Sequence, residues 1–301
     1  MSSDQKPVVL GGLLVAAGAV LLAAKGLFAK HLYALGLSFN DVAAIRSVMA
    51  VPGFALLAWL YRGPSTATTD HALSHNDLLL AVFAGLLCYY LGALANFYAL
   101  TIIDASVERS LLFAYPIFVV LITTVMTRKP PSPRVLLALM LTSLGVVLVT
   151  GALHTELSTA EWSGMGWILF CSLSIAIYFL ISGELTQRLG SGLFTLIAMT
   201  AAAIGMAIHY QFAEGWENIN LTEAAWWTLI ALVVFSTVLP LFLMAEGVRR
   251  VGAPQASLIS TLGPPATALM AYELSGEILN VSQFAGIGLV VIGVLALELR
   301  R

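Results

Sequence analysis

The second half of this 301-residue chain repeats the first half. When residues 105–145 are moved forward by 148 positions, they fall on residues 253–293, and identical residues coincide along the match. The coinciding pairs include Ala105 with Ala253, Pro116 with Pro264, Leu121 with Leu269, Leu141 with Leu289, and Gly145 with Gly293. The front of each half corresponds at a slightly different offset, which places Gly12 on Gly166 and Gly36 on Gly190. We therefore expect two similar units, residues 1–151 and residues 152–301.

Composition indicates that both units are membrane-embedded. Charged residues are 10% of the chain, against roughly 25% in soluble domains. Apolar stretches of about the ~20 residues that a helix needs to cross a bilayer recur along the whole sequence. They predict ten spans, at residues 8–29, 41–61, 78–101, 105–126, 134–151, 164–186, 191–212, 224–247, 253–273 and 281–299. The longest connection, 62–77, leaves no room for a soluble catalytic domain.

Five spans per unit have a consequence for orientation. Because five is odd, the second unit enters the bilayer from the opposite side to the first. The expected fold is thus an all-α membrane protein with ten transmembrane helices in two inverted five-helix repeats. Inverted repeats with Gly- or Pro-interrupted helices at matched positions are typical of secondary transporters, whose site lies between the repeats.

Basic residues predict which side faces the cytoplasm. With the N-terminus inside, the inner loops and tails hold ten of the 14 Lys and Arg residues: Lys6, Arg62, Arg128, Lys129, Arg134, Arg188, Arg249, Arg250, Arg300 and Arg301. The outer loops hold five glutamates and neither Lys nor Arg. This positive-inside bias predicts a multi-pass protein of the inner membrane with both termini in the cytoplasm.

Several short motifs accompany the two five-helix copies: Lys25-Gly26 and Phe28-Ala29-Lys30 at the end of the first span, Arg46 in the second, and Tyr115-Pro116 and Gly263-Pro264 in spans four and nine. With these features the chain resembles the drug/metabolite transporter superfamily, nearest to its EamA-type ten-helix exporters and their branch for aromatic and other amino acids. One departure is Lys129, which stands where the second repeat has Glu277. The resemblance implies an exporter of small metabolites; family members handle amino acids, nucleosides and cationic drugs.

Four charged residues lie toward the outer ends of spans. An ionisable group within a span is costly and by default functional, so Lys25 is expected to line a cavity; the alternative is that it reaches the outer headgroups, for which Lys30 is better placed. Arg46 is expected to pair with Asp41 or with Glu108. A set of four residues forms either a periplasmic gate or a static ion network, and the sequence leaves both open: Lys25, Arg46, Glu108 and Arg109.

Two polar stripes are expected near the middle of the membrane. By helical spacing, Gly85, Tyr89, Gly92 and Asn96 share one face of span three, and Trp167, Cys171, Ser174, Tyr178 and Ser182 share one face of span six. Either stripe could serve close helix packing. We interpret them, with Tyr115 of span four, as the aromatic wall of a substrate cavity. The expected substrate-binding residues are Lys25, Tyr89, Asn96, Tyr115, Trp167, Ser174 and Tyr178.

Acidic residues and prolines complete the candidate machinery. Glu184 and Glu246, near inner span ends, are expected to pair with neighbouring arginines, and no carboxylate stands at the midplane to indicate proton coupling. Prolines break backbone hydrogen bonds and bend helices. Pro116 and Pro264 are mid-span at matched positions, so they are the expected hinge; Pro52 and Pro240 are further mid-span prolines.

The function predicted from these features is export of small metabolites, foremost amino acids, by alternating access. The surplus of Lys and Arg near the outer side favours a substrate with a carboxylate. The alternative is export of quaternary-ammonium drugs, for which a buried acid would be expected at the midplane. An intramembrane enzyme would need a nucleophile with a base or a metal-ligand set at membrane depth, which the sequence lacks. We expect no cofactor, no metal and no nucleic acid, with the small-molecule substrate and the lipid bilayer as partners of a monomer.

Overall fold

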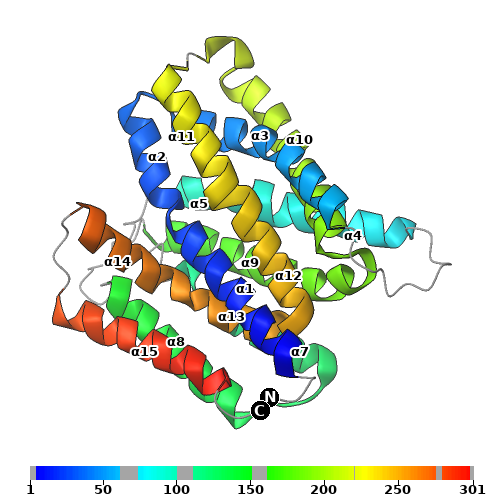
Figure 1. Ribbon diagram of the computed structural model, residues 1–301, viewed down its shortest axis with the longest axis vertical. Helices are drawn as coiled ribbons and strands as arrows, with labels where there is room; N and C mark the ends of the chain where they lie inside the picture. The colour runs from blue at the N-terminus through cyan, green and yellow to red at the C-terminus, as the bar shows by residue number, and fades with distance from the viewer. Residues whose placement is uncertain are drawn as a thin grey trace.

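A computed structural model of the chain describes residues 5–61, 74–99, 111–150, 161–219, 221–275 and 280–298. Within these ranges the regular secondary structure is entirely helical (Figure 1). The first half contains α1 (Gln5–Ala23), α2 (Lys25–Ala34), α3 (Phe39–Leu60), α4 (His75–Gly85), the π-helix η1 (Leu86–Leu91), α5 (Gly92–Ala99), α7 (Tyr115–Thr127) and α8 (Pro133–Thr150). The expectation of an all-α protein is confirmed.

The second half begins with two long uninterrupted helices and then follows the same order of broken ones. It contains α9 (Glu161–Leu189), α10 (Ser191–Ala213), the short 3-10 helix η3 (Trp216–Asn218), α11 (Glu223–Val233), the π-helix η4 (Val234–Val238), α12 (Leu239–Val251), α13 (Ala253–Ile259), the 3-10 helix η5 (Ser260–Leu262), α14 (Gly263–Ser275) and α15 (Val281–Glu298). The start of α1 and the end of α15 lie at the same end of the molecule (Figure 1).

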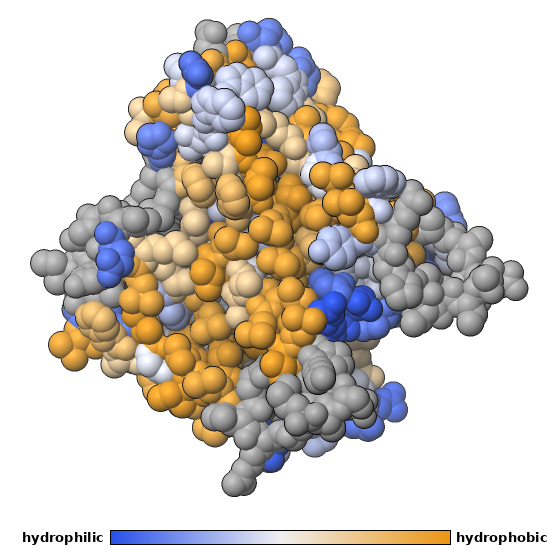
Figure 2. Space-filling view, in the orientation of Figure 1, coloured by the Kyte–Doolittle hydropathy of each residue, from blue (hydrophilic) through white to orange (hydrophobic). Residues whose placement is uncertain are grey.

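Several helices have the length and composition of membrane spans. Among the described residues, five helices are long and apolar enough to cross a bilayer, at Phe39–Leu60, His75–Asn96, Trp162–Leu189, Ser191–Ala213 and Glu223–Val251. Shorter apolar helices cover Val8–Ala23, Tyr115–Thr127, Pro133–Val149 and Val281–Ala296. Figure 2 shows apolar residues over the middle of one face and hydrophilic residues toward its top and edges. The exact count of ten spans stays a prediction.

The main helix contacts join one half of the chain to the other. Helix α8 packs along α15, α1 along α12, and α3 along α10, while α9 packs against α4 and α5 (Figure 1). Glycines allow the closest approaches. A Cβ atom added to Gly85 of α4 would lie 1.9 Å from the carbonyl oxygen of Ala198 in α10, and one added to Gly145 would lie 2.7 Å from a methyl carbon of Val290. Small residues thus bring helices together, as is common in membrane proteins.

Helix interruptions occur at corresponding places in the two halves. Helix α7 begins at Tyr115 after a turn, and α14 begins at Gly263 after η5, so each break directly precedes one of the matched prolines, Pro116 and Pro264. These two starts are 148 positions apart, and so are the first residues of η1 and η4. The sequence predicted the proline breaks but not the π-helices. Pro52 lies inside the uninterrupted helix α3.

Candidate functional site

Aromatic side chains from three helices meet where η1 contacts α9. The rings of Tyr89 in η1 and Tyr178 in α9 lie edge to face, with their centroids 4.8 Å apart. Tyr178 also contacts Phe194 of α10, at 5.5 Å between ring centroids. Edge-to-face contacts of this kind stabilise aromatic clusters beyond the area that they bury. Two predicted substrate residues, Tyr89 and Tyr178, therefore form one contact between the halves of the chain.

The third predicted tyrosine joins the same buried core. The ring centroids of Tyr115 and Phe179 lie 5.5 Å apart, and Phe179 is the neighbour of Tyr178 in α9. Tyr115 also belongs to the hydrophobic core cluster that contains Tyr178. Its hydroxyl forms a hydrogen bond with the hydroxyl of Ser260, at the start of η5. The break before α7 and the break before α14 are thus joined directly by side chains.

Two basic residues approach the η1 segment. Lys25 begins α2, directly after the interruption at Ala24, and its side chain is exposed. It still lies within electrostatic range of the buried thiol of Cys88. Arg46 of α3 lies within the same kind of range of the Tyr89 hydroxyl. Lys25 and Arg46 therefore both lie within electrostatic range of η1, Lys25 of Cys88 and Arg46 of Tyr89.

Serine hydroxyls satisfy the backbone where helices are interrupted. The Ser172 hydroxyl donates to the carbonyl oxygens of Leu111 and Leu112 at 2.7 and 2.8 Å, just before the turn that precedes α7. The Ser236 hydroxyl donates at 3.0 Å to the carbonyl oxygen of Leu21, near the end of α1. An unsatisfied carbonyl inside a membrane costs several kcal/mol. These hydrogen bonds supply donors to backbone carbonyls at the interruption after α1 and at the turn before α7.

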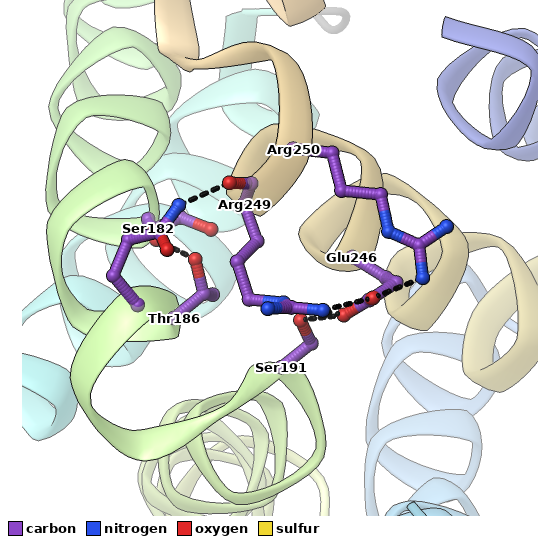
Figure 3. Close-up of polar contacts among 7 residues, drawn as sticks. Ser182, Thr186, Ser191, Glu246, Arg249 and Arg250 are labelled. Carbon is purple, nitrogen blue, oxygen red and sulfur yellow. Dashed lines mark hydrogen bonds and ion pairs between the residues drawn. The ribbon is translucent and has the colours of Figure 1, made fainter. Parts of the chain in front are cut away.

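A cluster of charged and hydroxyl groups joins α10 to α12 (Figure 3). The Glu246 carboxylate accepts hydrogen bonds from Arg249, at 2.9 and 2.6 Å, and from the Ser191 hydroxyl at the start of α10. Arg250 pairs with the same carboxylate at 2.7 Å. The Gln187 amide of α9 donates to the backbone carbonyl of Arg249. Because the Glu246 side chain is only 13% exposed, it needs these donors. The expected pairing of Glu246 is confirmed, as is that of Glu184 with Arg188, at 2.6 Å.

A second polar network lies at the start of α3 and the end of α10. Ser38 caps α3: its backbone N–H donates to Asp41 at 2.7 Å, and its hydroxyl accepts from the Asp41 N–H at 3.0 Å. The Tyr210 hydroxyl donates to the other carboxylate oxygen of Asp41. The Ser38 hydroxyl also reaches Glu214 at 3.2 Å. Asp41 therefore binds Ser38 and Tyr210. No ion pair between Asp41 and Arg46 occurs among the described residues, and the other expected partner of Arg46, Glu108, lies outside them, so the pairing of Arg46 stays a prediction.

Comparison with known proteins identifies the family. The model of the EamA-like transporter family matches residues 9–151 and 162–299. This chain belongs to the EamA-like transporter family. It is 33% identical over 304 residues to the uncharacterized transporter YcbK of Bacillus subtilis (strain 168), with 99% of this chain and 96% of the relative covered. It is 26% identical over 191 residues to the uncharacterized transporter YdfC of the same organism, covering 64% of this chain and 61% of the relative. A solved crystal structure shares the fold, with a TM-score of 0.80, 13% identity and 96% of both chains covered.

The remaining predicted site residues of this EamA-like transporter are less closely grouped. Trp167 is 45% exposed and packs on Tyr98 and Phe170; it lies eleven residues before Tyr178, about 16 Å along α9. The Ser174 hydroxyl bonds back to the Phe170 carbonyl at 2.8 Å. Asn96 of α5 is half-buried. Glu108, Arg109 and the side chain of Lys30 lie outside the described residues.

Sequence reasoning missed the contacts whose partners lie on distant helices. Neither Ser172 nor Ser236 was singled out as a partner for an interrupted backbone, and Ser191 was not expected beside Glu246. A buried serine in an apolar helix gives a weak signal, because the same residue type also serves simple close packing. The proline-marked breaks would have been the best guide, since each freed carbonyl needs a donor nearby.

Proposed function

We propose that this EamA-like membrane transporter exports small metabolites, foremost amino acids, from the bacterial cytoplasm across the inner membrane by alternating access. The observation that carries the proposal is that Lys25 and Arg46 lie within electrostatic range of η1, which contributes Tyr89 to the edge-to-face pair with Tyr178. Cationic side chains bind a carboxylate through charge-assisted hydrogen bonds. Aromatic walls with a few polar groups accept the apolar part of a small substrate.

The helix pairing supports the proposed inverted repeats of residues 1–151 and 152–301. The first apolar helix of one half packs on the third span of the other half in both directions, as α1 on α12 and as α9 on α4 and α5. The second spans pair with each other as α3 and α10, and the fifth as α8 and α15. Such an exchange of roles is what a two-fold relation between the halves requires. A carrier of this kind reorients one repeat against the other around a site between them.

The matched contacts of α8 and α15 support the same relation in finer detail. A Cβ atom on Gly145 would meet Val290 and Gly286 of α15, while one on Gly293 would meet Thr142 and Ala138 of α8. Moving Val290 and Gly286 back by 148 positions gives Thr142 and Ala138. We take this pair of helices as a scaffold around which the more interrupted helices move, and both chain ends as cytoplasmic.

Transport by purified protein in proteoliposomes tests the proposed substrate class. The panel contains radiolabelled amino acids with aromatic, aliphatic and charged side chains, the corresponding amino acid amides, and cationic dyes. The proposal expects flux of amino acids above that of protein-free vesicles, and little flux of the amides, which lack the carboxylate. Flux of the dyes alone would favour the alternative drug exporter. Flux of none of these solutes would refute both.

A further inference from the structure

One face of α9 carries hydroxyl groups from the aromatic cluster toward the charged cluster at Glu246. Tyr178, Ser182 and Thr186 follow each other at intervals of four residues, so they lie on the same face of the helix. The distance along the axis from Tyr178 to Thr186 is about 12 Å at ~1.5 Å per residue. Figure 3 shows Ser182 and Thr186 on this helix, with the side chain of Arg249 between them and Glu246.

These hydroxyls are buried, and among the described residues the hydroxyl of Ser182 has no hydrogen-bond partner. Ser182 is fully buried and Tyr178 is 6% exposed. Within the described part of the chain, the Ser182 hydroxyl has no hydrogen-bond partner, whereas the Tyr178 hydroxyl interacts with Tyr89, whose ring lies beside it. Thr186 is satisfied by the Ser182 backbone carbonyl. A buried polar group without a partner destabilises the resting protein. The unpartnered Ser182 hydroxyl, one turn from Tyr178 and the aromatic cluster, indicates a surface that meets a polar ligand in another state.

The charged cluster closes the inner end of this face. The Ser191–Glu246 hydrogen bond ties the start of α10 to α12, and the Gln187 amide ties α9 to the last turn of α12. Helix α13 packs behind them: a Cβ atom on Gly183 would lie 3.6 Å from Ala253. By contrast, Lys25 is exposed. In the proposed site it lies on the opposite side of the aromatic cluster from Glu246.

We propose that the Tyr178–Ser182–Thr186 face of α9 lines the inner half of the translocation pathway, and that Glu246 with Ser191, Arg249 and Arg250 is the inner gate that closes it. The inference rests on the proposed alternating-access export. In the open state the α10–α12 link is broken, and the hydroxyls of Tyr178 and Ser182 bind the polar groups of the substrate as it passes. In the state described here the gate is shut.

Thiol accessibility of the purified full-length protein in detergent tests this gate without requiring a transported substrate. Ser182→Cys is introduced into a Cys88→Ala/Cys171→Ala background, since these two are the chain's native cysteines and both are buried. The small reagent 2-aminoethyl methanethiosulfonate is added, and the remaining thiols are counted by a mass-tagged maleimide after denaturation. We expect slow modification with the native gate. Glu246→Gln should accelerate it roughly tenfold, because a hydrogen bond to a charged group contributes enough to shift an equilibrium by about that factor.

Matched controls separate gate opening from general loosening. Glu184→Gln removes a carboxylate that pairs with Arg188 on α9 but has no link to α12, so it should leave the rate unchanged. Thr142→Cys reports on a buried site between α8 and α15. Its thiol should stay unreactive both with native Glu246 and with Glu246→Gln. Ser191→Ala, which removes the α10–α12 hydrogen bond without removing a charge, should accelerate modification of the Ser182→Cys protein to a smaller degree.

The outcomes that overturn the inference are distinct from failure of the proposed function. If the Ser182→Cys thiol is modified at the same rate with native Glu246 and with Glu246→Gln, Glu246 does not gate this face. The same conclusion follows if Glu184→Gln accelerates the modification as much as Glu246→Gln does. If Ser182→Cys does not elute as a monodisperse species on gel filtration, Thr186→Cys on the same face replaces it under the same criteria. A Glu246-dependent rate in a protein that moves no amino acid would keep the gate and refute the proposed substrate.

Discussion

At the scale of single residues, the site depends on where Lys25 stands. It is the first residue after the interruption of α1, where the Leu21 carbonyl accepts hydrogen bonds from the Ala24 N–H and from the Ser236 hydroxyl. The sequence predicted Lys25 as a cavity residue from its cost in a span. It could not predict the closeness to Cys88, because that depends on how η1 of a separate helix packs.

Lys25→Gln is expected to weaken transport of a carboxylate substrate. Loss of a charge-assisted hydrogen bond should raise the substrate concentration at half-maximal flux about tenfold or more, with a smaller change in maximal flux. The measurement is the concentration dependence of amino acid flux in proteoliposomes. Lys30→Gln is the matched control, because Lys30 is expected to reach the headgroups. An unchanged concentration dependence in Lys25→Gln would remove this residue from the site.

Gly85→Ala is expected to destabilise the protein. The added methyl would lie 1.9 Å from the Ala198 carbonyl oxygen, so α4 and α10 must separate. Overpacking of this kind costs typically about 1–3 kcal/mol. Thermal unfolding in detergent, followed by tryptophan fluorescence, should show a lower midpoint. Gly166→Ala in α9 is the control, since nothing lies within 4 Å of its added methyl; a midpoint lowered equally in both variants would contradict the packing argument.

At the scale of secondary-structure elements, prolines explain some interruptions and leave others unexplained. A proline removes a backbone donor, so the breaks before Pro116 and Pro264 could be predicted from sequence. Nothing in Leu86–Leu91 marks a π-helix, yet η1 occurs 148 positions before η4. In η4 the Thr237 hydroxyl donates to the Leu232 carbonyl at 3.1 Å, five residues earlier, which satisfies a carbonyl in the widened turn. Such segments arise from packing between helices, and they are frequent at functional sites.

Pro116→Ala is expected to slow export while substrate binding is largely retained. Alanine restores a backbone donor and favours a continuous helix through the turn before α7, which opposes the bending that alternating access requires. Binding is followed by substrate-induced thermal shift and export by flux in vesicles. Pro52→Ala, in an uninterrupted helix, should leave both nearly unchanged. Equal loss of binding and flux in Pro116→Ala would mean that the proline shapes the site instead.

At the scale of the whole molecule, the arrangement follows from duplication and charge. The repeat offset of 148 predicted which prolines correspond, and the structure places helix starts at that same spacing. It could not predict that α1 pairs with α12 or α9 with α5, because in a membrane the choice of partner depends on small-residue fit between helices that are all apolar. Gly11 shows this dependence: a Cβ atom there would lie 2.7 Å from side-chain carbons of Arg250 and Val251 in α12.

Orientation in the membrane is the property on which the direction of export depends. Ten of the 14 Lys and Arg residues fall on one predicted side, which should be cytoplasmic because basic loops are retained there. Lys129, between α7 and α8, and Glu217, between α10 and α11, are both exposed and lie on opposite predicted sides.

In the Cys88→Ala/Cys171→Ala background, Glu217→Cys should react with an impermeant maleimide in intact cells. Lys129→Cys should react only after permeabilisation, which is the control for the accessibility of both sites. If Lys129→Cys is the one labelled in intact cells, the charge argument is wrong and the Glu246 gate faces the outside. Labelling of both would mean that an even number of spans separates them, which is incompatible with inverted five-helix repeats.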